Sequence, residues 1–248
     1  STLECTNVAA DPREMLRLTV ALALGLLLGC AEGYGIGGAV TRSQPRTVGR
    51  SRVVAVDLPG PLGDLVEQFG DSAPTDVSAQ GLGGTKGVVI TGGAGGVGYA
   101  YADTLLRLGH AVVICDVKDP AAPVASLKAK HGGGAQIFGT TCDVSKAESV
   151  EALGAFAKES LGTVHYWVNN AGINGGRRPF TTVPTKVVEA VVNVNLVGLL
   201  ICTKVAMDLM ADQPGVTGHI FQTVGSGVKG GGTPGYVAYG ATKRGLPQ

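Results

Sequence analysis

The sequence of 248 residues predicts an α/β fold with a doubly wound parallel sheet over residues 86–248, preceded by a single membrane-spanning helix. Short apolar runs rich in β-branched residues alternate with stretches of roughly ten to twenty residues that are suited to helices. A glycine-rich turn joins the first run to the first helix. Polar residues follow the ends of successive runs, which is where ligands lie in parallel sheets.

Composition narrows the functional class. The net charge is +1 with both signs spread along the chain, so no basic face for nucleic acid is expected. A hydrophobic content of 44% with 5% aromatic residues is typical of an α/β protein. No cluster of His and Cys indicates a metal site. The odd number of cysteines and the lack of a CxxC pair argue against a disulfide framework. We therefore expect reduced thiols at Cys5, Cys30, Cys115, Cys142 and Cys202.

The N-terminal 40 residues contain a candidate membrane span. Asp11–Glu14 has the features of a helix start, and the apolar run Leu18–Ala31 follows it. That run covers roughly 21 Å of helix, but a helix over about 15–38 reaches the ~30 Å of a hydrocarbon core. Small residues recur every four positions, as in membrane helices that pack closely: Ala21, Gly25, Gly29, Gly33 and Gly37.

Three other interpretations of this segment stay open. It could be a targeting peptide, a buried helix of a soluble domain, or a lipidation box at Leu27–Cys30. Arginines from Arg42 onward are typical of the side of a membrane that is not translocated. Residues 41–85 carry Arg, Pro, Ser and Gly around two modest apolar pieces, so we expect a linker with one short helix.

The glycine turn lies between a buried strand predicted at Gly87–Ile90 and a helix predicted from Val97. Gly92 is expected to form the tight turn, and Gly96 to let the backbone approach a pyrophosphate. Gly98 would let the helix pack close to the strand. The first N–H groups of that helix would then face phosphates. A plain glycine loop is the alternative, since 40 residues are Gly.

The remaining elements follow in order. Further strands are predicted at Ala111–Cys115, Gln136–Thr141, Val164–Val168 and His219–Val224, and long helices at roughly Lys146–Leu161 and Lys186–Gln213. Polar residues at or just past the strand ends should lie along one edge of the sheet: Asp116, Asp143, Asn169 and Ser226.

Asp116 ends the second strand, about twenty residues past the glycines. A carboxylate there can accept hydrogen bonds from both ribose hydroxyls of an adenosine, and it would repel a 2′-phosphate. This favours NAD over NADP, although the nearby Lys118 could soften the preference. An ordinary strand-end Asp that caps a loop is the alternative.

Tyr239 and Lys243 are spaced to share one helix face. A neighbouring ammonium lowers the pKa of a phenol from its usual value of about 10. Tyr239 could then donate a proton to a carbonyl oxygen as hydride arrives at carbon. Ser226 could hold the same oxygen. Asn195 is unfavourable inside a helix, and a role in holding a water that links Lys243 to solvent would explain it.

The ordered set of motifs resembles the short-chain dehydrogenase/reductase family over roughly residues 86–248. The set comprises Thr91-Gly92, Gly96-Val97-Gly98, Asp143-Val144, Asn169-Asn170-Ala171-Gly172, Asn195, Ser226 and Tyr239-Gly-Ala-Thr-Lys243. The resemblance implies a Rossmann fold, NAD or NADP as cofactor, and a catalytic site of Ser226, Tyr239, Lys243 and Asn195. The candidate cofactor-binding residues are Thr91, Gly92, Gly96, Val97, Gly98, Asp116, Asp143, Val144, Asn170, Ala171 and Gly172.

Within this family, the stretches around Trp167, Asn195, Phe221 and Tyr239 are similar to the chlorophyll b reductase branch. This resemblance implies reduction of the formyl group of chlorophyll b to a hydroxymethyl. It also implies a plastid enzyme, and some members of the branch carry membrane helices. We therefore expect a thylakoid membrane protein with its Rossmann domain on the stromal side and a pigment as substrate.

Two features depart from the family pattern. Gln248, the last residue, lies five residues after Lys243, whereas the family continues with the rest of that helix, two strands and a substrate lid. We expect a C-terminally truncated domain whose fifth strand is unpaired, either a fragment or a chain covered by another protein. Gly225 and Gly230–Gly232 would loosen the loop that carries Ser226.

These departures support a second functional hypothesis. The chain could be a non-catalytic, membrane-anchored structural subunit of a photosynthetic complex that retains a degenerate Rossmann domain. Its glycine-faced helix would then dock to neighbouring membrane-protein subunits.

Overall fold

A computed structural model describes residues 52–56, 84–228 and 230–246 of the chain. The segment predicted to span a membrane, at about 15–38, and most of residues 41–85 lie outside the described residues.

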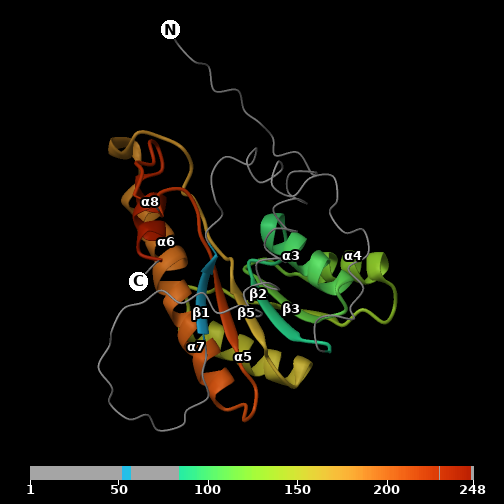
Figure 1. The fold of residues 1–248 in the computed structure, drawn as a ribbon. Helices are drawn as coiled ribbons and strands as arrows, with labels where there is room; N and C mark the ends of the chain where they lie inside the picture. Colours follow the sequence, from blue (N-terminus) through green and yellow to red (C-terminus); the bar gives the residue numbers. More distant parts are fainter. Residues whose placement is uncertain (1–51, 57–83, 229, 247–248) are drawn as a thin grey trace, which may run out of the picture.

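The strands form one six-stranded sheet in the order β1-β6-β5-β2-β3-β4, in which all neighbours are parallel (Figure 1). They are β1 Arg52–Val56, β2 Gly87–Thr91, β3 Ala111–Asp116, β4 Ile137–Thr141, β5 Tyr166–Asn169 and β6 His219–Thr223. The chain runs outward from β2 to β4 and then returns to β5 on the other side of β2. The predicted doubly wound fold is therefore confirmed.

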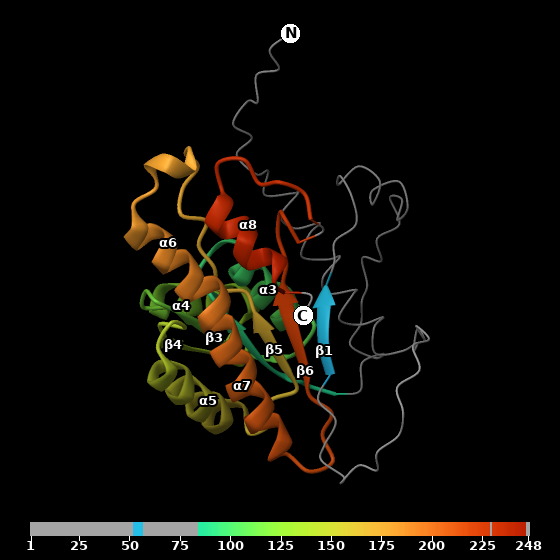
Figure 2. The same cartoon turned by 90° about the vertical axis from the view of Figure 1, so that its left-hand side faces the viewer.

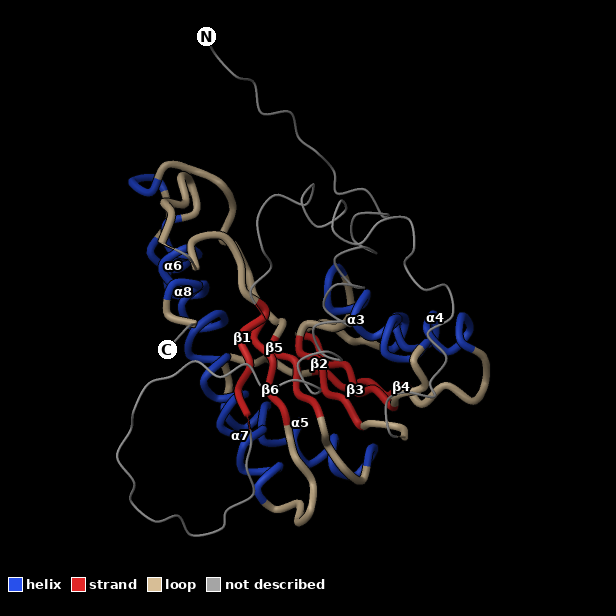
Figure 3. Tube along the Cα trace, viewed as in Figure 1, coloured by secondary structure: helices blue, strands red, loops and turns tan. Residues whose placement is uncertain are grey.

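Helices cover both faces of this sheet (Figure 3). Helices α3, Gly96–Arg107, and α4, Ala121–His131, pack on one face, and α5, Ala147–Leu161, and α7, Leu199–Ala211, pack on the other. Successive residues of β2 belong to different cores, because Val88 and Ile90 face α3 whereas Val89 faces the opposite layer. Burial on both sides explains why the strand is a continuous apolar run.

The long helix that the sequence predicts at Lys186–Gln213 has three parts. Helix α6, Thr185–Val192, continues through a π-helical turn, η3, at Asn193–Gly198 into α7. Within the described part of the chain, Thr185–Ala211 is the one helical run long and apolar enough to cross a membrane, with a mean hydropathy of 1.8. It packs against α5 and against α8, Val237–Arg244, so it is a layer of this domain. A short 3₁₀ turn, η2 at Phe180–Thr182, precedes it.

The edge of the sheet beside β6 differs from the expectation of an unpaired fifth strand. β1 pairs with β6 from Arg52 opposite His219 to Val56 opposite Thr223 (Figure 2). Backbone groups that an open edge would expose are thus paired with backbone. β1 also places a strand of the sheet inside the range 41–85, where the sequence predicts a linker with one short helix.

Histidines gather at the amino ends of the strands, opposite the predicted site. His110 Nδ1 accepts a hydrogen bond from the backbone N–H of Lys86 at 3.3 Å, and His165 Nδ1 accepts from that of Gly87 at 3.0 Å. Both bonds require a neutral imidazole with its lone pair on Nδ1. Burial lowers the pKa of both histidines, and the charge of Lys86 adds to this shift. His219 belongs to the same group, since the Tyr166 ring contacts the His110 ring on one side and the His219 ring on another.

We expect the domain to lose stability as the pH falls below about 6.5, the usual histidine pKa. Because the folded-state pKa values are lowered, the unfolded chain binds protons first, and stability declines as the pH falls through the folded values. Each backbone bond to imidazole contributes about 1 kcal/mol. Urea unfolding at neutral and mildly acidic pH measures the loss. The double variant His110→Asn/His165→Asn keeps an acceptor near each Nδ1 position that does not titrate. Its unfolding free energy should therefore depend less on pH than that of the unaltered chain. The same pH dependence in both proteins would contradict the role of the two histidines.

Candidate functional site

The carboxyl ends of β2 and β5 are tied together by Thr91. Its hydroxyl donates to the carbonyl of Val168 at 3.4 Å and accepts from the backbone N–H groups of Asn170 and Ala171, both at 3.0 Å. The side-chain amide of Asn170 donates to the carbonyls of Thr91 and Gly92, both at 3.0 Å. The glycine turn is thereby held against the start of the loop after β5, at the switch point of the sheet.

The glycines of the turn divide into packed and open positions. A Cβ on Gly98 would lie 2.2 Å from the Gly92 carbonyl oxygen, and a Cβ on Gly92 would lie 2.8 Å from Ala171 Cα. At Gly95 and Gly96 an added Cβ would meet nothing within 4 Å. Open space therefore lies at the start of α3, where unpaired N–H groups favour an anion. A dinucleotide diphosphate fits this cradle.

Asp116 and Asp143 lie at the same edge and bind neighbouring backbone. Asp116 Oδ2 accepts from the Ala94 N–H of the glycine turn at 3.2 Å, and Oδ1 accepts from the Lys118 N–H at 3.3 Å. Asp143 Oδ1 accepts from the N–H and the hydroxyl of Ser145, at 3.0 and 2.7 Å. Asp116 thus helps to hold the glycine turn in place, and Asp143 holds the loop that leads into α5.

Beside Asp143, Val144 is buried under the π turn, where a Cβ on Gly198 would lie 2.8 Å from the Val144 carbonyl oxygen. Val97, in the first turn of α3, is half-buried against the core, and Gly172 is exposed. Asn169, expected at the edge, is instead buried: its side chain accepts from Trp167 Nε1 and donates to Thr203.

Tyr239 and Lys243 reach the edge from α8. The Tyr239 hydroxyl packs against Gly225, where an added Cβ would lie 2.1 Å from Oη. Ser226, the next residue, is exposed. Lys243 Nζ donates to the Thr223 carbonyl at 2.8 Å and lies 5.7 Å from the centroid of the Tyr239 ring. The structure thus brings the phenol, the ammonium and the loop that carries Ser226 together.

The pKa of Tyr239 differs from the expectation that Lys243 lowers it. Burial raises the pKa of this phenol and lowers that of the Lys243 ammonium. The physical reason is that Nζ is directed at the Thr223 carbonyl, so desolvation dominates at the phenol. Tyr239 is therefore protonated at neutral pH, as a proton donor must be.

Asn195 lies buried in the π turn and connects two parts of the site. Its Oδ1 accepts from the Ile173 N–H, and its Nδ2 donates to the Ile173 carbonyl, both at 2.8 Å. Nδ2 also contacts the Thr242 hydroxyl at 3.2 Å, and that hydroxyl donates to the Tyr239 carbonyl at 2.7 Å. The side chain therefore links the loop after β5 to α8, and the water predicted there stays a prediction.

The sequence reasoning missed the roles of Thr223, Ile173 and Thr242, and it assigned Gly225 to loop flexibility rather than to the contact with the Tyr239 hydroxyl. Three of them act through backbone atoms, and Thr242 acts through a small hydroxyl within a helix, so no residue pattern marks them. Their only local signal is position: Thr242 lies inside the YxxxK motif, Thr223 lies near the end of the fifth predicted strand, and Gly225 follows that strand.

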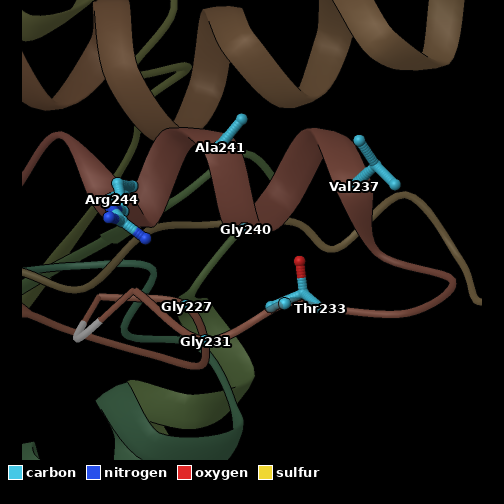
Figure 4. A pocket seen from close by; sticks show the side chains of 8 residues that line it. Gly227, Gly231, Thr233, Val237, Gly240, Ala241 and Arg244 are labelled. Atoms are coloured by element: carbon cyan, nitrogen blue, oxygen red, sulfur yellow. The ribbon is translucent and has the colours of Figure 1, made fainter.

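A pocket of about 440 Å³ lies on another side of α8 (Figure 4). It is lined by the loop glycines Gly227 and Gly231 and by Thr233, Val237 and Arg244. Tyr239 and Lys243 do not line it, so it is separate from the predicted reaction site.

Comparison with known families decides which fold family this arrangement represents. The family model for short chain dehydrogenases matches residues 86–248. The chain belongs to the short-chain dehydrogenase family. Membership and the open glycine cradle together assign NAD or NADP to this edge of the sheet.

Curated relatives include chlorophyll(ide) b reductase NOL, chloroplastic, of Oryza sativa subsp. japonica, 39% identical over 160 residues (63% of this chain and 46% of that protein). Another is probable chlorophyll(ide) b reductase NYC1, chloroplastic, of Arabidopsis thaliana, 36% identical over 181 residues (66% and 36%). The chain thus spans less than half the length of these relatives.

Solved structures of family members share the fold. A short chain dehydrogenase from Mycobacterium smegmatis matches with a TM-score of 0.61 and 26% identity over 71% of each chain. A short chain dehydrogenase/reductase from Burkholderia phymatum, in complex with NAD, matches with a TM-score of 0.59 and 29% identity over 66% of this chain and 57% of that one.

Replacing Thr91 should destabilise the domain through its lost hydrogen bonds. Thr91→Val keeps the shape but leaves backbone N–H groups unpaired, which should cost about 2–3 kcal/mol of unfolding free energy. Thr91→Ser retains the hydroxyl and should cost clearly less. Urea unfolding of both variants measures the difference, and a Val variant as stable as the Ser variant would remove Thr91 from this role.

Asp116 should set the preference between cofactors. Asp116→Ser removes the charge that would repel a 2′-phosphate, so the affinity for NADPH relative to NADH should rise about tenfold. The ratio cancels any loss of binding that both cofactors share through the Ala94 contact. Titration of each reduced cofactor measures it, with Lys118→Ala as the control for the neighbouring charge. An unchanged ratio for Asp116→Ser would refute the assignment.

Proposed function

We propose that this chain is an NAD(P)-dependent carbonyl reductase that acts on the formyl group of a chlorophyll b-type pigment. The observation that carries the proposal is the position of the Tyr239 hydroxyl, against Gly225 and beside the Ser226 loop. A protonated phenol is thereby presented at the same sheet edge as the glycine cradle.

Tyr239, Ser226 and Lys243 each have a separate role in the reduction. The cofactor, when bound, supplies hydride. Tyr239 donates its proton to the carbonyl oxygen, so the aldehyde becomes a hydroxymethyl group. Ser226, exposed on its loop, would hold that oxygen. Lys243 lies beside the Tyr239 ring, where its positive charge stabilises the phenolate that proton donation leaves.

The substrate class is inferred from relatives. Two relatives named chlorophyll(ide) b reductases are 36–39% identical to this chain over the domain. A formyl carbon is an aldehyde, the group that hydride and a phenol proton convert to an alcohol.

The proposal includes a location. The names of the relatives include the word chloroplastic, which supports a plastid enzyme. The apolar segment at about 15–38 would anchor it in the thylakoid membrane, and the arginines after that segment favour a stromal domain. Protease protection of the full chain in isolated thylakoids would measure this orientation; a domain protected inside the lumen would contradict it.

The proposal predicts that the full chain with NADH or NADPH converts chlorophyll b to its hydroxymethyl form. Tyr239→Phe should lower kcat about a hundredfold or more while cofactor affinity stays, because only the transferable proton is lost. Gly225→Ala should lower kcat as well, since its Cβ displaces Oη. Product mass and cofactor absorbance measure turnover.

Tyr99→Phe is the matched control, because that exposed hydroxyl contacts Ser126 on α4 and not the reaction site, and its loss should leave kcat unchanged. Full activity in Tyr239→Phe would refute the proton-donor role. Failure of the unaltered chain to bind either cofactor would favour the non-catalytic subunit instead.

A further inference from the structure

Thr242 is a buried threonine of α8, three residues after Tyr239 and directly before Lys243. Its hydroxyl donates to the Tyr239 carbonyl at 2.7 Å and accepts a hydrogen bond from Asn195 Nδ2 at 3.2 Å. The residue is 2% exposed, so its hydroxyl depends on these protein partners. Both reactive side chains of α8 are therefore neighbours, along the helix, of a hydroxyl that is bound from outside the helix.

The Asn195 side chain continues this contact to the loop after β5. Its Nδ2 donates a second hydrogen to the Ile173 carbonyl, and its Oδ1 accepts from the Ile173 N–H, both at 2.8 Å. With the amide turned over, Oδ1 would face the Ile173 carbonyl, and two acceptors would oppose each other. The hydrogen bonds therefore run in one fixed direction, from the amide of Asn195 through Thr242 to Tyr239.

These bonds join two segments that the reaction site needs. The loop after β5 begins at Asn170, whose backbone N–H and side chain bind the end of β2 and the glycine turn, so this loop is fixed relative to the cofactor cradle. Helix α8, which carries Tyr239, lies against α6 and η3 (Figure 2). The bonds of Asn195 to Ile173 and Thr242 thus hold α8 at a set place relative to that loop.

We propose that Thr242 is a positioning residue for proton transfer, whose hydroxyl sets the place of the Tyr239 phenol relative to the cofactor edge. The inference rests on the proposed function, because it concerns the proton that Tyr239 donates to the carbonyl oxygen. The Thr242 hydroxyl is engaged by Asn195 and by the Tyr239 carbonyl, so it acts through these groups and not on the reacting atoms. A displacement of about 1 Å at a reacting group can cost about a hundredfold in rate.

The test is the substitution Thr242→Val, which replaces the hydroxyl by a methyl group and leaves one Nδ2 hydrogen of Asn195 without its acceptor. With chlorophyll b and the reduced cofactor, we expect kcat to fall about tenfold while the KM for the cofactor stays unchanged. Thr242→Ser keeps the hydroxyl and should restore most of kcat. Titration with the cofactor counts the folded molecules, so a loss of stability alone would leave kcat per folded molecule unchanged and would overturn the proposal.

Thr203→Val is the matched control. The Thr203 hydroxyl also donates to a backbone carbonyl of its own helix, that of Leu199 at 2.8 Å, and accepts from an asparagine, Asn169 Nδ2 at 3.0 Å. Its helix is α7, and its amide partners are in β5 and β6 rather than at α8. This variant should lose stability as Thr242→Val does, yet keep its kcat. An equal fall of kcat in both variants would show a general effect of lost buried hydroxyls and would contradict the role of Thr242.

A double-mutant cycle with Asn195→Ala tests the route of the effect. Because Thr242 acts through Asn195, Thr242→Val should change kcat little in a chain that already carries Asn195→Ala. Losses of kcat that multiply in the double variant would overturn the proposal. Thr242→Ala also removes the hydroxyl, and it should lower kcat in the same way if the valine variant does not fold.

Failure of this inference is distinguishable from failure of the proposed function. An unaltered chain that does not reduce the pigment would remove the proposed function, and the role of Thr242 with it. An unaltered chain that reduces the pigment, together with a Thr242→Val variant of full kcat, would remove the role of Thr242 alone.

Discussion

The junction between β2 and β5 is the constraint on which the site depends. The sheet reverses its winding there, so the loops after the two strands leave toward opposite faces and open a crevice. The Thr91 hydroxyl closes the base of that crevice by pairing three backbone groups at once, and Asn170 secures the two carbonyls beside it. The cradle is therefore rigid where it meets the sheet and open where a diphosphate would lie.

The reactive side chains are positioned mainly by contacts with backbone. Tyr239 rests on Gly225, Lys243 binds the Thr223 carbonyl, and Asn195 binds both backbone groups of Ile173. Asn195 lies within the π turn, a form of helix that occurs frequently at functional sites. Burial that fixes these groups also shifts their pKa values, so the geometry and the protonation of Tyr239 have one cause.

Sequence patterns predicted the strands and helices whose buried residues form a regular apolar pattern. They did not predict α4 or β1. The five strands from Gly87 onward lie within two residues of the predicted bounds. The reason is clearest for β2 and β3, which are buried on both faces and are therefore nearly unbroken apolar runs. Helix α4 was not predicted, since Leu127 is its one fully buried residue and its composition shows no apolar face. β1 was not recognised either, because its pairing with β6 joins segments far apart in the chain.

The sequence by itself determined the winding of the sheet, the family and the candidate reactive residues, because periodicity and motif spacing are local properties. The tertiary structure alone decided that β1 covers the edge beside β6 and that Asn195 holds Ile173 and Thr242. It also reversed the expected direction of the Tyr239 pKa. Each of these outcomes depends on which distant atoms surround a group and exclude water from it, and that arrangement exists only once the chain has folded.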